Sequence, residues 1–261
     1  MTAATPSEID DSGVTVERDG PVATITLCRP DVLNAQTPEM WSALADIGRD
    51  LSGDVRVVVV RGAGRAFSAG LDLKRANDPA RGAIGSIATL PPDDAASHIA
   101  RFQEAFTWFG RPDILSIAAV QGHAIGAGFQ LALACDMRIL AADAQLTMAE
   151  IGLGLVPDLG GTGPLVRLVG YARALEICVT GRRVGAEEAL AMGLANLVVP
   201  PEELDGAVRD LTAAVLAGAR DAVVEIKALL AGATDRTPAE QLAAEREAQV
   251  RRLRDLAGVG D

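Results

Sequence analysis

A glycine-rich stretch in the middle of the chain has the composition of an anion-binding turn. It follows the apolar run Ile114–Val120, which we interpret as a buried strand, and leads from Gly122 through Gly126 and Gly128 into a short apolar helix. The N–H groups at a helix N-terminus have no intrahelical partner and lie at the positive end of the helix dipole. The stretch is therefore a candidate seat for an oxyanion or a phosphate. Close packing of a helix on a sheet needs the same small residues, so the stretch alone leaves both interpretations open.

A second glycine-rich turn repeats this arrangement earlier in the chain. The β-branched run Val55–Val60 predicts a central strand, and the glycine-rich segment Gly62–Leu73 follows it directly. Two turns of this kind can present one N–H each to a single oxygen atom.

A carboxylate in an apolar loop is the third feature that can do chemistry. Glu150 is followed by Ile151, Leu153 and Leu155. Apolar surroundings disfavour the charged form of a carboxyl group, which raises its pKa and suits it to acid–base catalysis. A salt bridge or a helix cap is the alternative role for Glu150, and these residues alone do not decide between the two.

The sequence lacks the motifs of several other sites. It has no G-x-x-x-x-G-K-[ST] phosphate loop, and the middle turn lacks the third glycine of the dinucleotide-binding fingerprint. Ser68 and Ser116 can act as nucleophiles only beside a base, and there is no G-x-S-x-G elbow. We expect His98 in a helix and His123 in the glycine-rich turn, which disfavours a serine hydrolase.

The elements that must position these residues alternate between strands and helices. Val14–Arg18 and Val22–Leu27 flank Asp19-Gly20 and predict a β-hairpin. Thr37 followed by Pro38 predicts the start of a helix. Further strands are predicted at Met137–Ala142, Gln145–Met148 and Leu197–Val199. Helices alone follow, so we expect a layered α/β core with a helical C-terminal extension.

Two segments between the turns carry weaker signals. Asn77–Pro92 is rich in Gly, Pro and Ala without periodicity, which predicts a long loop that is mobile or covers a site. An apolar stripe at helical spacing follows, and such a stripe favours core over ligand wall. Its members are Ile99, Phe102, Phe106 and Phe109.

The C-terminal extension begins after Pro200-Pro201. One apolar helix face is predicted there, made by Leu204, Val208, Leu211 and Val215. Thr237–Glu240 is a capping box that opens a charged helix over Ala239–Leu256.

Composition limits the classes of protein to which the chain can belong. Its 261 residues are 49% hydrophobic, enough for one large α/β domain. The formal net charge of −11 argues against a nucleic-acid partner, and no stretch reaches membrane-spanning length. The three cysteines are widely spaced and no secretion signal is evident, so we expect a cytoplasmic protein with free thiols. Two histidines are too few for a histidine-rich metal site.

Taken together in order, the motifs resemble those of the crotonase superfamily, the enoyl-CoA hydratase/isomerase family. The resemblance covers about Val14 to Leu230. Each motif is weakly specific by itself, but their order is highly specific. The four main signatures are Arg29–Ala35, Gly64–Leu73, Gly122–Gly128 and Glu150–Thr162, and shorter matches continue at Leu168–Gly170, Thr180-Gly181, Ala186–Ala189 and Gly193–Asn196.

The resemblance implies a crotonase fold and an acyl-CoA thioester substrate. The thioester oxygen would be held between the backbone N–H groups of Leu71 and Ala127, with Glu150 as acid and base. Coenzyme A, as part of the substrate and not as a cofactor, would follow Val32 and the segment Ala69, Leu71, Asp72 and Leu73, with Lys74 or Arg75 near a phosphate. Residues 1–200 would form the acyl-CoA-binding core. Residues 201–261 would form the oligomerisation region of a homotrimer or a dimer of trimers.

One position departs from the pattern of the hydratases in this family. They use two carboxylates, and Gln130 stands in place of the second one. An amide can orient a water but cannot take its proton. The resemblance therefore favours Δ3–Δ2 enoyl-CoA isomerisation with Glu150 as a single proton shuttle. A hydratase using Glu150 alone, with Gln130 placing the water, and an acyl-CoA-binding protein with little catalysis are the alternatives.

Asp158 adds a further carboxylate near Glu150. Its position matches an acid of dienoyl-CoA isomerases, but a Pro-Asp pair is common at this point in the family. We expect Asp158 to brace its loop, and we count it with Gln130 among the residues that face the substrate.

Overall fold

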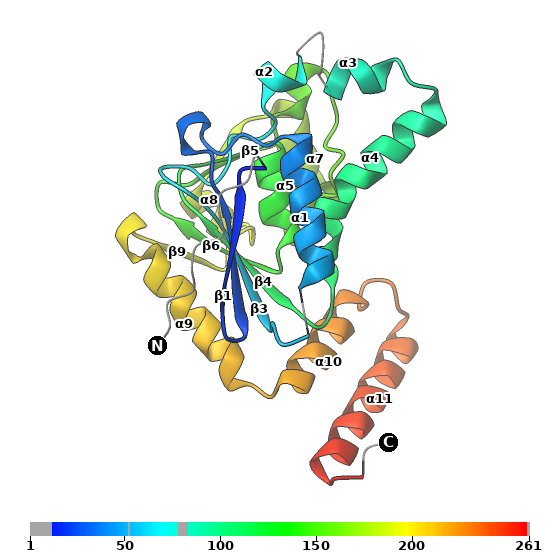
Figure 1. Cartoon of the computed structure of the whole chain (residues 1–261). Coiled ribbons are helices and arrows are strands. Elements are labelled where there is room, and N and C mark those ends of the chain that lie inside the picture. The colour runs from blue at the N-terminus through cyan, green and yellow to red at the C-terminus, as the bar shows by residue number, and fades with distance from the viewer. Residues whose placement is uncertain (1–11, 52, 78–82, 260–261) are drawn as a thin grey trace.

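A six-stranded sheet forms the centre of the protein in the computed structural model, which describes residues 12–51, 53–77 and 83–259. The strand order is β1-β2-β3-β4-β6-β9; β1 pairs with β2 antiparallel, and all other pairs are parallel (Figure 1). The strands are β1 (Val14–Asp19), β2 (Val22–Leu27), β3 (Val57–Gly62), β4 (Leu115–Val120), β6 (Met137–Ala141) and β9 (Leu197–Val199). The predicted hairpin and the predicted central strand are confirmed.

A second, smaller sheet lies beside the first and holds the glycine-rich turns together. It contains three strands in the order β5-β7-β8, with β5 parallel to β7 and β7 antiparallel to β8. Their bounds are β5 (His123–Ile125), β7 (Gln145–Thr147) and β8 (Arg183–Gly185). His123 therefore begins a short strand, whereas the sequence predicted an irregular turn.

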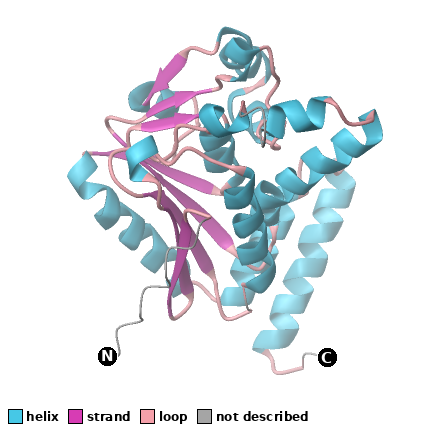
Figure 2. Cartoon of the chain, turned by 45° about the horizontal axis from the view of Figure 1, so that its top comes forward, coloured by secondary structure: helices cyan, strands magenta, loops and turns pink. Residues whose placement is uncertain are grey.

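Helices cover both faces of the large sheet, as Figures 1 and 2 show. Successive residues of β3 point to opposite faces: Val58 and Val60 join the cluster under α1, α4 and α5, and Val57 and Val59 join the cluster under α9. A β-branched run suits such a strand because both of its faces are buried. These four helices are α1 (Pro38–Asp50), α4 (Pro92–Thr107), α5 (Ala127–Ala134) and α9 (Leu204–Ala217).

The remaining helices are shorter or lie toward the C-terminus. They are α2 (Leu73–Ala76), α3 (Ala83–Ala88), α6 (Thr162–Val169), α7 (Tyr171–Thr180), α8 (Ala186–Ala191), α10 (Arg220–Ala231) and α11 (Pro238–Leu256). Single 3-10 turns span Pro30–Val32, Trp108–Gly110, Glu150–Leu153 and Pro201–Glu203.

Local sequence accounts for two of the helix starts. Thr37 accepts a hydrogen bond from the Met40 N–H and is followed by Pro38, so α1 begins where it was predicted. Thr237 and Glu240 form a complete capping box at the start of α11. Each cap satisfies N–H groups that a helix leaves without an internal partner.

The segment Asn77–Pro92 differs from its prediction as a long loop. Residues 78–82 lie outside the described part of the chain, but Ala83–Ala88 forms the helix α3, and α4 begins at Pro92. The sequence of α3 lacks the apolar periodicity of a helix packed on a core, because its described side chains are mostly exposed.

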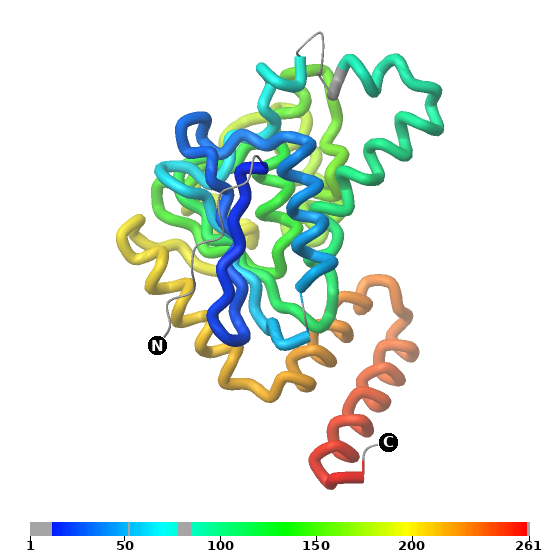
Figure 3. The backbone as a smooth tube through the Cα atoms, in the orientation of Figure 1, coloured from blue at the N-terminus to red at the C-terminus, as the bar shows by residue number. Residues whose placement is uncertain are grey.

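The last two helices form an arm that extends away from the sheet, visible at the end of the tube in Figure 3. Lys227 ties α10 to the body: its ammonium donates to the carbonyl oxygens of Phe109 and Ile114 and to Asp136. By contrast, α9 packs on the sheet through Leu204 and Val208, and Leu211 and Val215 complete the predicted apolar face. Among the described residues, no helix is both long enough and apolar enough to span a membrane.

Candidate active site

One cavity of about 570 Å³ brings together most of the predicted site residues. It lies between the two glycine-rich turns, the 3-10 turn at Glu150 and the helices α1, α3 and α4. The lining residues that carry polar side-chain groups are Trp41, Gln130, Glu150 and Asp158. The predicted residues that line it are Ala69, Leu71, Leu73, Ala127, Gln130, Glu150 and Asp158.

The first turn presents the N–H of Leu71. A parallel bridge pairs Gln36 with Leu71, in which the Gln36 N–H donates to the Gly70 carbonyl at 2.6 Å and the Asp72 N–H donates to the Gln36 carbonyl at 2.8 Å. In a parallel bridge the N–H of the middle residue points away from the paired strand. Among the described residues, the Leu71 N–H accordingly makes no backbone hydrogen bond outside regular elements.

The second turn presents the N–H of Ala127. Gly126, with φ of 50°, precedes α5 as its N-cap, and its own N–H donates to the Thr147 carbonyl at 2.8 Å. Ala127 is the first residue of α5, so its N–H has no intrahelical acceptor. The helix dipole adds partial positive charge at this point.

The two turns touch each other through their backbones. Ser68 forms a bridge with Ala124, and a Cβ on Gly70 would overlap the Ile125 carbonyl oxygen and lie 3.5 Å from the Ala127 nitrogen. A Cβ on Gly128 would lie 2.6 Å from the Ser68 carbonyl oxygen. The close-packing interpretation of the glycine-rich stretch is therefore confirmed, and this packing places Leu71 and Ala127 at the same cavity, so the anion-binding interpretation stays a prediction.

A buried network of side chains supports the first turn, and sequence reasoning did not find it. The Ser68 hydroxyl donates to the Asn34 carbonyl at 2.8 Å and accepts from the Gly70 N–H at 3.2 Å and from Gln36 Nε2 at 3.1 Å. Gln36 Oε1 in turn accepts from the Trp41 indole at 2.7 Å. Because Trp41 lines the cavity, the network joins the cavity wall to the Leu71 turn.

Glu150 faces the cavity from the start of a 3-10 turn. Its Oε1 accepts a hydrogen bond from Gln130 Nε2 at 2.7 Å, and its Oε2 is buried without a hydrogen-bond partner in the described structure. A Cβ on Gly126 would lie 3.3 Å from Glu150 Oε1, so the carboxylate lies against the second turn. Neither a salt bridge nor a helix cap occupies this side chain within the described residues.

The cavity raises the pKa of both of its carboxyl groups. Burial raises the pKa of Glu150, and the nearby charge of Asp158 adds to this, while the hydrogen bond from Gln130 opposes it. Burial also raises the pKa of Asp158. The main-chain oxygen of Asp158 accepts from Gln103 Nε2 at 2.7 Å, which ties this loop to α4, and Asp158 is among the residues that line the cavity.

Two predicted residues do not line this cavity. Asp72 pairs with Arg29 at 2.9 Å and caps α2 by accepting from the Arg75 N–H. Burial alone would raise the pKa of Asp72, but these hydrogen bonds outweigh it and lower the pKa. Val32 lies in the 3-10 turn of the first signature with its side chain 44% exposed.

Only part of the apolar stripe predicted at helical spacing lines the cavity. Ile99 and Phe102 line the cavity, whereas Phe106 and Phe109 are buried in the core. The Phe102 ring packs against Trp41 with centroids 4.8 Å apart. Ile87 of α3 also lines the cavity, so the segment predicted as a covering loop does contribute to this wall.

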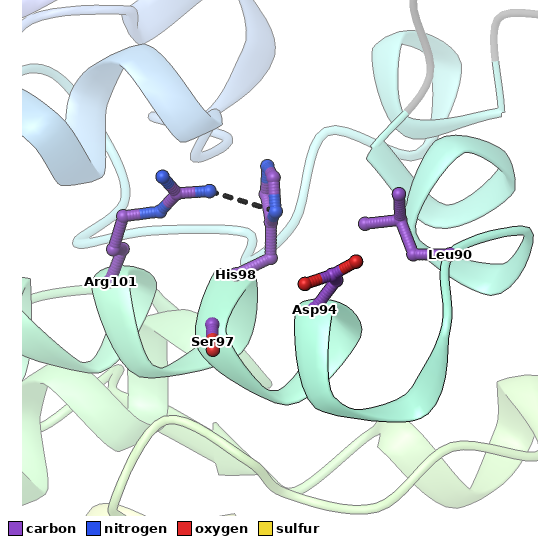
Figure 4. Close-up of a pocket in the computed structure, with 5 residues that line it drawn as sticks. All are labelled: Leu90, Asp94, Ser97, His98 and Arg101. Carbon is purple, nitrogen blue, oxygen red and sulfur yellow. Dashed lines mark hydrogen bonds between the residues drawn. The ribbon is translucent and has the colours of Figure 1, made fainter.

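The side chains weighed as nucleophiles and bases lie apart from one another. The Ser116 hydroxyl donates to Asp136 at 2.8 Å, and the Ser68 hydroxyl belongs to the network above. His98 contacts Arg101 at 2.8 Å (Figure 4), and both line a second hollow, which has a volume of about 450 Å³. That hollow is lined by Leu90, Asp94, Ser97, His98 and Arg101, all from α4 or the turn before it.

Comparison with known proteins gives concordant matches over nearly the whole chain. The family profile described as Enoyl-CoA hydratase/isomerase matches residues 17–255. Carnitinyl-CoA dehydratase of Salmonella enteritidis is 37% identical over 229 residues, which are 86% of this chain and 82% of that protein. Short-chain-enoyl-CoA hydratase of Clostridium acetobutylicum is 33% identical over 220 residues, covering 81% and 78% of the two chains.

A solved structure extends the likeness to three dimensions. It is that of a Thermobifida fusca YX protein in complex with acetoacetyl-CoA, provisionally designated an enoyl-CoA hydratase. The two share 48% sequence identity with a TM-score of 0.90, over 97% of this chain and 100% of that one.

Proposed function

The chain belongs to the enoyl-CoA hydratase/isomerase family of the crotonase superfamily, and on that basis we propose that it is an isomerase that moves the double bond of a 3-enoyl-CoA to the 2-position. The observation that carries the proposal is the Glu150 carboxylate, which accepts a hydrogen bond from the Gln130 amide, in a mostly apolar cavity that Leu71 and Ala127 also line.

The proposed reaction moves one proton between two carbons. Glu150 takes a proton from C2 of the acyl group, and the electrons of the broken C–H bond flow onto the thioester oxygen to form an enolate. The enolate is conjugated with the C3–C4 double bond; when it collapses, the thioester carbonyl is restored, the double bond forms between C2 and C3, and the C3–C4 π electrons take the proton from Glu150 at C4. No other reactant is consumed.

The N–H groups of Leu71 and Ala127 would stabilise the enolate oxygen. Fixed donors accelerate a reaction when they bind the transition state more strongly than the ground state, and an oxygen that gains charge satisfies this condition. Loss of one such donor costs about 3–4 kcal/mol of barrier in other enzymes. Coenzyme A would enter along Ala69 and Leu73, where the exposed Lys74 and Arg75 lie near the cavity mouth.

The contacts of Gln130 favour isomerisation over hydration. Its Oε1 accepts from the Leu159 N–H at 2.9 Å and from the Gly161 N–H at 3.2 Å, which uses both lone pairs. A water beside it can therefore meet only the amide N–H, which would donate to the water oxygen and reduce its nucleophilicity. Hydration by Glu150 alone is the second candidate, favoured by the activity that the name of the Clostridium acetobutylicum relative states.

Ultraviolet absorbance with a medium-chain trans-3-enoyl-CoA tests the proposal. We expect growth of the band of the conjugated 2-enoyl thioester with the wild-type protein and loss of at least about 10³-fold in rate with Glu150→Gln. Glu188→Gln, which removes a carboxylate on the surface, is the matched control and should keep the wild-type rate.

Three other outcomes of this experiment would lead to different conclusions. Equal rates for wild type and Glu150→Gln would remove Glu150 from the mechanism. A flat trace together with hydration of a 2-enoyl-CoA would favour the second candidate. A flat trace with acyl-CoA binding alone would indicate a binding protein.

We also propose that the chain assembles into a trimer or a dimer of trimers. The support is the arm of α10 and α11, which exposes several large apolar side chains that a partner subunit would cover. They are Ile226, Leu230, Leu242, Val250, Leu253 and Leu256. Sedimentation equilibrium tests this, and a mass of one chain at micromolar concentration would contradict it.

A further inference from the structure

We propose that Gln130 is the positioning residue of this site: its amide donates to Oε1 of Glu150 and fixes the carboxylate in one orientation at the cavity, and it thereby selects proton transfer between carbons over addition of water. This inference rests on the proposed function, and the experiments below separate the failure of one from the failure of the other.

The orientation of the Gln130 amide is set from both of its ends. Its oxygen accepts from the backbone N–H groups of Leu159 and Gly161, and a rotated amide would place NH₂ hydrogens against these donors. The same rotation would place the amide oxygen against the Glu150 carboxylate. Both ends therefore favour the arrangement in which Nε2 donates to Glu150 Oε1 at 2.7 Å.

Close packing prevents Gln130 from leaving this position. The side chain is 1% exposed, and a Cβ on Gly161 would lie 2.7 Å from Gln130 Cγ. The absence of a side chain at Gly161 thus lets the backbone of the 159–161 loop reach the amide oxygen. The loop, α5 and the Glu150 turn meet at this one amide.

The two oxygens of Glu150 consequently have different surroundings. Oε1 is held by the amide and lies against Gly126, whereas Oε2 is buried without a partner among the described residues. A buried oxygen with no partner costs stability, and a catalytic role is one of the recognised reasons for a protein to keep one. A carboxylate with one oxygen hydrogen-bonded and the other enclosed by protein keeps a fixed orientation, which suits removal and return of one proton on the same substrate.

The amide also favours the charged form of the base. Burial raises the pKa of Glu150, and the hydrogen bond from Gln130 counteracts part of that rise because it stabilises the carboxylate. Without this donor the pKa of Glu150 would rise further, and less of the group would be ionised at neutral pH.

Two variants test these effects. Gln130→Met keeps the length of the side chain and removes the donor, and Gln130→Glu keeps an oxygen for the Leu159 and Gly161 N–H groups, so that it preserves the fold if methionine does not. For both we expect kcat for isomerisation to fall roughly 10- to 100-fold, as for loss of a hydrogen bond to a charged group. The acid limb of the kcat/KM profile should move to higher pH, and with Gln130→Glu the ratio of isomerisation to hydration should fall at least about tenfold.

Gln103→Met is the matched control. Gln103 lies in α4, and its substitution removes an amide donor to the same loop, the one to the Asp158 carbonyl, without removing the donor to Glu150. The acid limb of its kcat/KM profile should stay at the same pH as in the wild type. A shift equal to that of Gln130→Met would reduce Gln130 to a loop brace and overturn the inference.

Infrared titration of Glu150 separates the inference from the proposed function. The difference spectrum between wild type and Glu150→Gln isolates the carboxylate band of Glu150 without any turnover. If that band titrates at higher pH in Gln130→Met, the Gln130 amide stabilises the Glu150 carboxylate, even if the wild-type protein shows no isomerase activity. An unchanged titration in both Gln130 variants would disprove this role of Gln130, whatever reaction the wild type catalyses.

Discussion

The two N–H donors that face the cavity are held in place by different means. Side chains support the Leu71 turn: Ser68 and Gln36 brace it from within, and the Arg29–Asp72 ion pair closes it outside. Backbone pairing holds the Ala127 turn, since the bonds of β5 and the Gly126–Thr147 bond run between main-chain groups. Main-chain bonds hold the Leu71 turn as well, through its bridge to Gln36, but this turn has buried side-chain support in addition. Substitution of Ser68 should therefore disturb the first turn more than the second.

The largest effect should come from a backbone change in the Ala127 turn. Ala127→Pro removes the N–H donor, and the first position of a helix accepts proline well. We expect kcat to fall about 10²- to 10³-fold with an intact circular dichroism spectrum. Tyr171→Pro is the control, because Tyr171 is the first residue of α7 and also follows a glycine N-cap. Retention of the wild-type rate in Ala127→Pro would remove this N–H from the mechanism.

A clash between the two turns should be next in size. Gly70 has φ of 82°, and a Cβ there would overlap the Ile125 carbonyl, so Gly70→Ala must displace one turn from the other. We expect a loss of about 1–3 kcal/mol in the free energy of unfolding, together with lower kcat. Gly20→Ala carries a similar backbone strain, with φ of 53°, but has open space around it. If urea denaturation showed equal losses in the free energy of unfolding for the two variants, the contact between the turns would contribute nothing to stability.

Loss of the internal brace should affect only the first turn. Ser68→Ala leaves the Gly70 N–H and the Asn34 carbonyl without their shared partner, which costs about 1–3 kcal/mol. We expect kcat to fall roughly tenfold with KM little changed. Ser116→Ala removes a comparable pair of bonds to Asp136 outside the cavity, so it should lose stability at full kcat. Identical kcat in both variants would contradict the role of the network.

The smallest effect should come from the outer ion pair. Arg29→Gln removes the cation beside Asp72, and a pair of this kind contributes at most about 1 kcal/mol. Because the folded protein lowers the pKa of Asp72, the stabilisation is present above the ordinary pKa and is lost as pH falls through the lowered value. The difference in melting temperature between wild type and variant should therefore be largest near neutral pH and should shrink in acid. A difference that grows in acid would contradict the assignment.

Local patterns predicted most of the strands and helices, and the resemblance of the motifs named most of the residues that line the cavity. The hairpin, the start of α1 and the strands before both turns follow from neighbouring residues, and the crotonase fold expected from the order of motifs is confirmed. The helix α3 was missed because a helix with exposed side chains needs no apolar period. Phe102 could not be separated from Phe106 by spacing, since only the packing of α4 decides which of them meets the cavity.

The side-chain network and the orientation of Gln130 could not be predicted for a different reason. Ser68 and Gln36 lie 32 residues apart, and the Gln130 oxygen is bound by N–H groups 29 and 31 residues further along the chain. Neither contact leaves a local pattern in the sequence. A one-residue change in the path of the 159–161 loop would alter the partner of Gln130 without altering any motif.

The two backbone N–H groups that donate to the Gln130 oxygen have a consequence for how such a site evolves. The N–H groups of Leu159 and Gly161 require an oxygen at this point, and a glutamate would supply one as well as a glutamine does. Codons for the two amino acids differ in a single base. A lineage can therefore exchange a one-acid site for a two-acid site by one point mutation, with the backbone already in place for both.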